Sequence, residues 1–312
     1  MHKRWITVVT VVIVASTALA SCGGGGSEEA EPKESTTTAE ASGPAVELMT
    51  ETFVDPSRPT EDAAGPGADD RTLETRIAHP TSGGPYPLIV LSHGFGGHPD
   101  EYEQTIQDWA ADGFVVAAPA FPLTNDQNPT QEDNLLDVNN QPDDVSFVID
   151  EVLAANEDED SALHGLVDPD AIGAVGHSLG GATTWAASFH TGKGDDRIDS
   201  TVIFAGVVIE MEGGELDFAD GPPLLVFHGD ADDVPMDMGR NAYEEAGPPK
   251  WYVTLHGATH VPAFTDDTSP HDDLVNRTVL DFWHGTLDGD DAALDRVTDD
   301  ATDPELSTVD HE

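Results

Sequence analysis

Residues 173–181 read GAVGHSLGG, and this stretch indicates the fold. A short apolar run, AIGAVG at 171–176, precedes Ser178, and the helix-forming segment GGATTWAASFH follows at 180–190. A strand–turn–helix sequence around G-x-S-x-G presents a serine hydroxyl on a sharp turn at the carboxyl edge of a sheet. Glycines on both sides of Ser178 are expected there, because side chains would collide with neighbouring backbone. The stretch therefore predicts an exposed serine in an α/β fold.

Apolar runs and helical segments alternate on both sides of this turn. Strands are expected at 71–80, 87–94, 114–119, 171–176, 200–206, 223–229 and 251–257. Helices are expected at 101–113, 143–156, 180–190 and 271–285. Continuous apolar strands between helices predict a mostly parallel central sheet with helices on both faces.

Acidic residues far outnumber basic ones in the sequence. The chain holds 12 Lys and Arg against 61 Asp and Glu, a formal net charge of −49. Such a surface repels nucleic acids and anionic lipid headgroups, so neither is an expected partner. Because the acids are spread along the chain, we interpret them as a solvated coat that keeps the protein soluble in concentrated salt.

The first 22 residues form a separate segment. Lys3 and Arg4 precede an apolar stretch too short to span a bilayer comfortably, which is typical of a secretory signal. The segment ends LASC at Leu19–Cys22, which resembles the bacterial lipoprotein signal. Cys22 is the only cysteine, so a lipid anchor at this residue explains it better than a plain cleaved signal does. We therefore expect an extracytoplasmic protein that is anchored to the cell membrane.

Composition suggests four segments. After the signal at 1–22, residues 23–49 are rich in Gly, Ser, Thr and Glu and predict a disordered linker. The globular pattern covers 50–285. Residues 286–312 predict an acidic C-terminal tail, with a possible short helix at 290–297 and a frayed remainder.

A serine nucleophile needs a base and an orienting acid, in the chain order Ser, acid, His for this architecture. The loop FHGDADDVP at 227–235 follows a strand and offers Asp230, Asp232 and Asp233. Asp232 is our choice, and Asp230 and Asp233 stay open as alternatives. At most one of the three serves as the acid, and the others are turn or cap residues.

The base is expected in HGATHVPAF at 256–264, which follows the next strand. His256 lies almost at the strand end, where a side chain tends to pack against the sheet. His260 lies further out and can turn inward to the carboxyl edge, where Ser178 also lies. His260 is therefore the predicted base.

The oxyanion of an ester transition state needs preorganised donors. The backbone N–H of Leu179, directly after the serine, is one expected donor. The glycine-rich segment SHGFGGHPDEY at 92–102 follows an early strand and offers the N–H of Phe95 as the second.

No residue spacing demands a metal, nucleotide or flavin, so no cofactor is expected. His271, Asp272 and Asp273 could suggest a metal site, but acids in the first turn of a helix explain them.

Four motifs resemble the α/β-hydrolases, in their dienelactone-hydrolase-like, chlorophyllase-like and polyester-hydrolase-like branch. These motifs, in order, are LSHGFGG, GHSLGG, HGDADDVP and GATHVP. The resemblance implies Ser178 as nucleophile, Asp232 as acid and His260 as base, with Phe95 and Leu179 at the oxyanion. Dienelactone hydrolases proper use a cysteine nucleophile, and the best polyester hydrolases carry an aromatic pocket wall where this chain reads IFAGVV.

The sequence therefore predicts a serine carboxylic-ester hydrolase acting through an acyl-enzyme on small-molecule or lipid esters. One alternative is a lipase, phospholipid-acyl hydrolase or cutinase-like polyester hydrolase. Another, from a different class, is a surface-binding lipoprotein without turnover.

Overall fold

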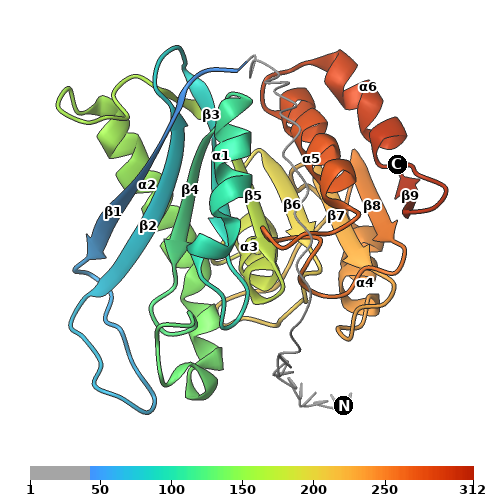
Figure 1. Cartoon of the computed structure of the whole chain (residues 1–312). Helices are drawn as coiled ribbons and strands as arrows, with labels where there is room; N and C mark the ends of the chain where they lie inside the picture. Colours follow the sequence, from blue (N-terminus) through green and yellow to red (C-terminus); the bar gives the residue numbers. More distant parts are fainter. Residues whose placement is uncertain (1–42) are drawn as a thin grey trace, which may run out of the picture. The chain divides into compact units, whose positions relative to one another are not determined.

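The apolar segments form the centre of one sheet, as the pattern of continuous hydrophobic runs predicts. In residues 43–312, which the computed structural model describes, nine strands lie in the order β1-β2-β4-β3-β5-β6-β7-β8-β9 (Figure 1). The strands are β1 (Val46–Asp55), β2 (Arg71–Pro80), β3 (Tyr86–Ser92), β4 (Val115–Ala120), β5 (Val167–His177), β6 (Ser200–Phe204), β7 (Leu224–Gly229), β8 (Lys250–Leu255) and β9 (Ser307–His311). The pairings from β4 through β3 to β8 are parallel, and those at the two edges are antiparallel.

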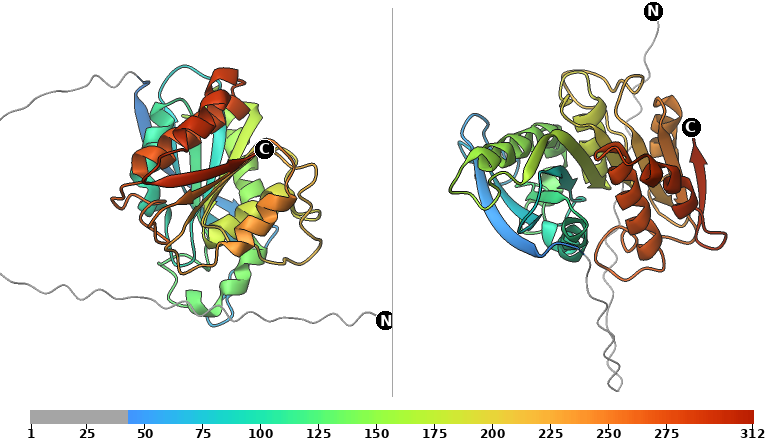
Figure 2. Two further views of the ribbon diagram at one scale, coloured as in Figure 1. Left: turned by 90° about the vertical axis from the view of Figure 1, so that its right-hand side faces the viewer. Right: turned by 90° about the horizontal axis from the view of Figure 1, so that it is seen from above.

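Helices cover both faces of this sheet, which Figure 2 shows from two further sides. They are α1 (Glu103–Ala111), α2 (Gln141–Glu157), α3 (Leu179–Phe189), α4 (Asp237–Glu245), α5 (Asp272–Thr286) and α6 (Asp291–Asp300), with short 3-10 helices η1 (Pro99–Tyr102), η2 (Gln131–Asp133) and η3 (Leu135–Asn139). None of the helices within residues 43–312 is long and apolar enough to cross a membrane.

Alternate side chains of β3 enter the two layers of the core, as the pleat requires. Ile89 and Leu91 pack in the cluster that holds α1, α5 and α6, whereas Leu88 and Val90 pack in the cluster that holds α2. Each face of the sheet is therefore buried under its own helices, and the predicted α/β architecture with helices on both faces is confirmed.

The start of the domain differs from the sequence-based expectation. Strand β1 begins at Val46, inside the segment predicted as linker, and all ten of its residues pair with β2. Most of its side chains are exposed or half-buried, as in an edge strand, and composition alone did not separate it from a polar linker. The predicted signal, Cys22 and residues 23–42 of the linker lie outside the described residues.

The end of the chain also differs. The helix predicted at 290–297 does form, as α6, but the prediction that the rest of 286–312 is frayed is wrong. Residues 307–311 form β9, which pairs with all of Trp251–Leu255 in β8. Helix α6 buries Ala293 and Val297 in the core, and the Trp251 indole N–H donates to Thr298 Oγ1 at 2.9 Å. The acidic residues of this segment lie on its outer side, so its charge does not prevent it from packing.

Candidate active site

The turn around Ser178 is strained in the way the sequence predicts. Strand β5 ends at His177 and α3 begins at Leu179, so Ser178 alone makes the turn, with φ of 56° and ψ of −113°. A positive φ is uncommon for a residue with a side chain and is tolerated only where the surroundings impose it. A Cβ added to Gly176 would lie 2.1 Å from the Gly180 carbonyl oxygen, and one added to Gly180 would lie 2.1 Å from that of Ser92. Both glycines are therefore required by close backbone packing.

Three predicted residues from three loops meet at the carboxyl edge of the sheet. His260 Nε2 lies 2.7 Å from Ser178 Oγ, and His260 Nδ1 lies 2.8 Å from Asp232 Oδ2. A carboxylate only accepts, so Nδ1 carries the proton and donates to Asp232. The bare Nε2 of the neutral ring then accepts from the Ser178 hydroxyl. The structure thus brings the serine, the imidazole and the carboxylate into one hydrogen-bonded chain.

The neighbouring acids of the β7 loop have other contacts. Asp230 Oδ1 accepts the Gly257 N–H at 2.6 Å and so fastens the β7 loop to the loop after β8. Asp233 is exposed, whereas the Asp232 side chain is fully buried. Asp232 is therefore the acid that contacts the imidazole.

Two groups hold the Asp232 carboxylate from its other sides. Oδ1 accepts the Val234 N–H at 2.7 Å. The ring of buried His228, on β7, donates from Nε2 to the Val234 carbonyl oxygen at 3.0 Å, and the same Nε2 lies 3.4 Å from Asp232 Oδ2. Burial raises the pKa of Asp232, but the hydrogen bonds from His260 and Val234 outweigh it, so this pKa lies below its usual value. Burial lowers the pKa of His228, so this ring is neutral beside the carboxylate. His228 was not among the residues predicted from the sequence, although it lies at the strand end, four residues before Asp232.

One predicted oxyanion donor, Leu179, directly follows Ser178 in the chain, and the other, Phe95, directly follows Gly94, which lies against Ser178. Phe95 belongs to the loop between β3 and η1, where a Cβ added to Gly94 would lie 3.4 Å from Ser178 Cβ. Within residues 43–312, neither the Phe95 nor the Leu179 N–H has a hydrogen-bond acceptor. The next N–H of the loop, that of Gly96, donates to Thr124 O at 2.8 Å. Both predicted donors thus have no acceptor within the described part of the chain.

An apolar wall adjoins these donors. The Leu179 side chain lies in a cluster formed by the first turns of α3, η3 and the loop after β6. Its buried members are Val138, Leu179, Ala182, Ala186 and Met211, and the half-buried Phe95, Val207 and Ile209 pack against them. These half-buried side chains form a partly exposed apolar surface next to Leu179.

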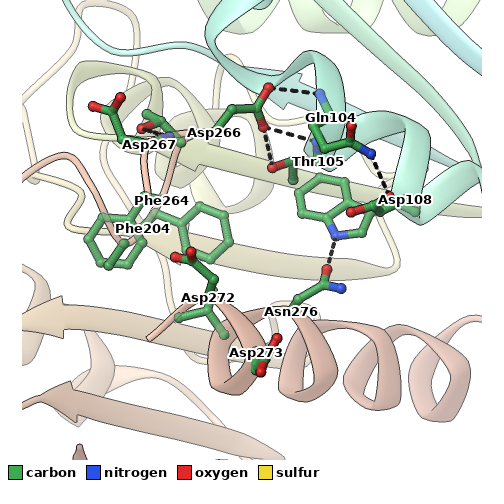
Figure 3. A pocket seen from close by; sticks show the side chains of 14 residues that line it. Gln104, Thr105, Asp108, Phe204, Phe264, Asp266, Asp267, Asp272, Asp273 and Asn276 are labelled. Carbon is green, nitrogen blue, oxygen red and sulfur yellow. Dashed lines mark hydrogen bonds between the residues drawn. The ribbon is translucent and has the colours of Figure 1, made fainter. Parts of the chain in front are cut away.

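A separate pocket of roughly 220 Å³ lies on the α1 and α5 side of the sheet (Figure 3). Phe204 and Phe264 stack in its wall with ring centroids 5.2 Å apart. Asp266 at its rim accepts from the Gln104 and Thr105 N–H groups. Ser178, Asp232 and His260 do not line this pocket, so it is distinct from the serine site.

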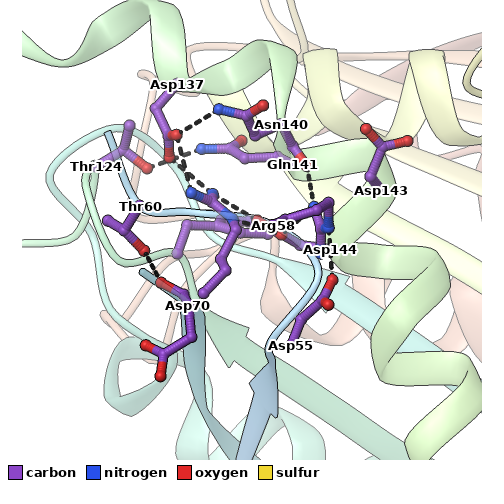
Figure 4. Close-up of polar contacts among 12 residues, drawn as sticks. Asp55, Arg58, Thr60, Asp70, Thr124, Asp137, Asn140, Gln141, Asp143 and Asp144 are labelled. Atoms are coloured by element: carbon purple, nitrogen blue, oxygen red, sulfur yellow. Dashed lines mark hydrogen bonds and ion pairs between the residues drawn. The ribbon is translucent and has the colours of Figure 1, made fainter. Parts of the chain in front are cut away.

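A second buried polar cluster joins η3, the first turn of α2 and the start of β2 (Figure 4). Arg71 is 1 % exposed and donates to Asp144 at 2.6 Å and to Asp137 at 2.8–3.0 Å. Arg58 adds an ion pair to Asp144 at 2.8 Å. The neighbouring Gln141 donates to Thr124 and accepts from Thr183 on α3. This cluster joins the β1–β2 hairpin to the loop that supports Phe95.

In the described part of the chain, no three His, Cys, Asp or Glu side chains are grouped so that they could hold a metal ion. His271 precedes α5, where its Nε2 donates to the His256 carbonyl oxygen at 3.1 Å, and Asp272 and Asp273 lie in the first turn. These residues are accounted for by the helix start.

Comparison with known families identifies the fold family. The family model described as Chlorophyllase matches residues 68–236, more than half of the chain. The chain belongs to the chlorophyllase family. It is accordingly an α/β-hydrolase of the esterase type. The family match includes Ser178 and Asp232, whereas His260 lies beyond its end. No curated protein matches the chain.

Proposed function

We propose that this chlorophyllase-family protein is a serine carboxylic-ester hydrolase. The observation that carries the proposal is the hydrogen-bonded chain from Ser178 through His260 to Asp232, at distances of 2.7 and 2.8 Å. Nucleophile, base and orienting acid in this geometry are what acyl transfer through a serine requires.

The reaction follows from the proton positions. His260 Nε2 takes the Ser178 proton as Oγ attacks the ester carbonyl carbon, and the carbonyl oxygen becomes an oxyanion. The free N–H groups of Phe95 and Leu179 stabilise that charge. Protonated His260 then donates to the leaving alcohol, and an acyl-enzyme remains on Ser178. Water activated by His260 releases the acid, while Asp232 holds the imidazole in the required tautomer.

The apolar wall supports a hydrophobic substrate. Phe95, Val207 and Ile209 are half-buried beside the oxyanion donors, so an apolar acyl or alcohol group would bury surface there. A charged acyl group would meet no counter-charge among these side chains. We therefore expect esters of apolar chains to be preferred over short charged ones.

The test is Ser178→Ala with p-nitrophenyl esters graded by acyl length. We expect loss of at least about 10³-fold in kcat/KM, because the covalent route is removed. In the wild-type protein a fluorophosphonate should label Ser178. Full activity in Ser178→Ala would overturn the assignment, and absence of both labelling and turnover would favour a binding protein.

A lipase or phospholipid-acyl hydrolase is a second candidate, favoured by exposed apolar side chains near the site. Leu136 in η3 is 79 % exposed and Val261, beside His260, is 40 % exposed. Such side chains could enter a lipid interface. Activity that rises sharply above the solubility limit of a triglyceride would support this candidate, and a smooth hyperbolic dependence would contradict it.

We further propose that the protein is exported and carries a lipid on Cys22, which would tether it outside the cytoplasmic membrane. The sequence LASC supports this. Cys22→Ala should move the protein from the membrane fraction to the soluble fraction after cell lysis. Unchanged membrane association of this variant would contradict the anchor.

A further inference from the structure

His177, the last residue of β5, touches two other parts of the site. Its ring is buried, directly before Ser178 in the chain. Nε2 lies 2.7 Å from the His260 carbonyl oxygen, and Nδ1 lies 3.1 Å from the Tyr102 hydroxyl. Tyr102 is 1 % exposed and ends η1, the short helix that follows the Phe95 loop. One side chain thus bridges the loop after β8 and the loop after β3.

The chemistry of the partners fixes the proton positions. A carbonyl oxygen only accepts, so His177 Nε2 must carry a proton and donate to His260. Burial lowers the pKa of His177 to about 3, so the ring is neutral and its Nδ1 is bare. Nδ1 therefore accepts from the Tyr102 hydroxyl, whose own pKa is raised by burial. The two hydrogen bonds run in one direction, from Tyr102 through His177 to His260.

The same ring packs against the loop that carries His260 and lies close to the loop that carries Phe95. The His177 ring centroid lies 5.0 Å from that of His260 and 5.6 Å from that of Phe264. A Cβ added to Gly94 would lie 3.4 Å from His177 Nδ1 and equally far from Ser178 Cβ. His177 therefore contacts the base loop, and Gly94 of the oxyanion loop lies against both His177 and the nucleophile turn.

His260 needs such a support because of where it lies. It follows β8 by five residues, in a stretch without helix or strand that continues to α5. Its own ring bonds, to Ser178 and Asp232, are the bonds that change during the reaction. A hydrogen bond to its backbone carbonyl fixes the loop without taking part in proton transfer.

We propose that His177 and Tyr102 are positioning residues that hold His260 at the correct distance from Ser178. This inference rests on the proposed serine hydrolase function. Because the support comes from the residue adjacent to Ser178, base and nucleophile share one anchor at the end of β5. Misplacement of reacting groups by about 1 Å can cost about 100-fold in rate. Loss of the His177 support should therefore lower kcat rather than raise KM.

The experiment compares His177→Leu, Tyr102→Phe and the double variant with the wild type, using p-nitrophenyl butyrate. Rates are divided by the number of serines that a fluorophosphonate titrates, so that unfolded protein does not count. His177→Leu should lower kcat about 10–100-fold with KM changed less than about twofold. Tyr102→Phe should lower kcat about 2–10-fold, the effect of one hydrogen bond. The double variant should lose no more than His177→Leu alone, because the two residues act in series.

Two further variants separate positioning from general stability. His177→Gln returns an N–H donor near the Nε2 position and should recover most of the lost kcat. Tyr252→Phe is the matched control, since Tyr252 is also buried and its hydroxyl has no partner within residues 43–312. It should leave kcat per titrated serine unchanged.

The outcomes distinguish this inference from the function on which it rests. Wild-type kcat in both His177→Leu and Tyr102→Phe, with Ser178→Ala inactive, would overturn the positioning role and leave the hydrolase intact. If His177→Leu does not fold, wild-type kcat per titrated serine in Tyr102→Phe would overturn it equally. Additive losses in the double variant would show that Tyr102 does not act through His177. Activity retained by Ser178→Ala would instead remove the proposed function itself.

Discussion

The molecule holds two buried polar clusters, and they differ in how their buried charged groups are paired. In the cluster around Arg71, the guanidinium faces the carboxylates of Asp137 and Asp144, so the charges of opposite sign are paired at 2.6–3.0 Å. At the serine site, one carboxylate lies among histidine rings, and Ser178 is held at a positive φ. The first arrangement gives every guanidinium nitrogen of Arg71 a carboxylate partner. The second leaves the Phe95 and Leu179 N–H groups without acceptors in the described residues and keeps the Ser178 backbone strained, as is typical of functional sites.

The histidines make this difference possible. Burial lowers the pKa of His93 to about 4 and of His177 to about 3, so both are neutral near the site. Neutral rings orient neighbours by hydrogen bonds without adding a charge that would compete with His260 for Asp232. By contrast, burial tends to lower the pKa of Arg71, but Asp144 and Asp137 outweigh it and hold this pKa above its ordinary value.

The largest effect on kcat should come from removing the negative charge of Asp232 at the serine site. Asp232→Asn keeps the shape but reverses the hydrogen bond to His260 Nδ1, which favours the wrong tautomer. We expect kcat to fall about 10⁴-fold, with thermal stability changed much less. Steady-state kinetics with p-nitrophenyl esters is the measurement.

The neighbouring acids provide matched controls for that variant. Asp233→Asn removes an exposed charge and should keep wild-type kcat. Asp230→Asn weakens the contact to the Gly257 N–H and should cost only a few-fold. A larger loss in either control than in Asp232→Asn would move the acid role to that residue.

A smaller effect, on stability rather than rate, should follow from Arg71→Met. Removing the cation leaves Asp137 and Asp144 buried without their main partner, which destabilises a protein by about 3–5 kcal/mol. Urea unfolding of Arg71→Met against the wild type measures this. Arg296→Met is the control, because Arg296 is 52 % exposed in its pair with Asp281 and its loss should cost much less than that of Arg71. Equal losses in the two variants would contradict the distinction between buried and surface pairs.

The smallest effect concerns pH. Hydrogen bonds to Asp112 at 2.7 Å and Asp288 at 2.6 Å raise the pKa of His284 from 6.5 to about 9. The folded protein therefore holds a proton that the unfolded chain loses, so this stabilisation is complete below pH 6.5 and disappears as the pH rises through about 9. Because the site is partly exposed, His284→Gln should cost only about 1 kcal/mol at pH 6 and nothing at pH 10. Thermal midpoints at both pH values test this, and an equal cost at both would contradict the charge-based cause.

Local sequence was sufficient for the strand–turn–helix around Ser178 because its signals lie within about ten residues. The order of Ser178, Asp232 and His260 added a second constraint, since parallel strands deliver their loops to one edge. The choice of Asp232 over Asp230 and Asp233 needed the structure, because all three lie in one loop and only Asp232 contacts the His260 ring.

Other features depended on contacts between distant segments. Arg71 meets Asp137 and Asp144 across 66 and 73 residues, and nothing near Arg71 in the sequence indicates that it is buried. The bond from His177 to His260 spans 83 residues. Strand β9 was missed because STVDH is short and polar, and its partner β8 gives it a place at the edge of the sheet.

The two edge strands also fix where the ends of the described chain lie relative to Ser178. Val46 pairs with Pro80, beyond the start of β4, and Glu312 exchanges hydrogen bonds with Lys250, the first residue of β8. Both ends of the described chain thus leave from the amino ends of the parallel strands, whereas Ser178 follows the carboxyl end of β5. A bead, fusion partner or surface joined directly at either end would lie at the amino ends of the parallel strands, with Ser178 at the opposite edge facing the surrounding solution.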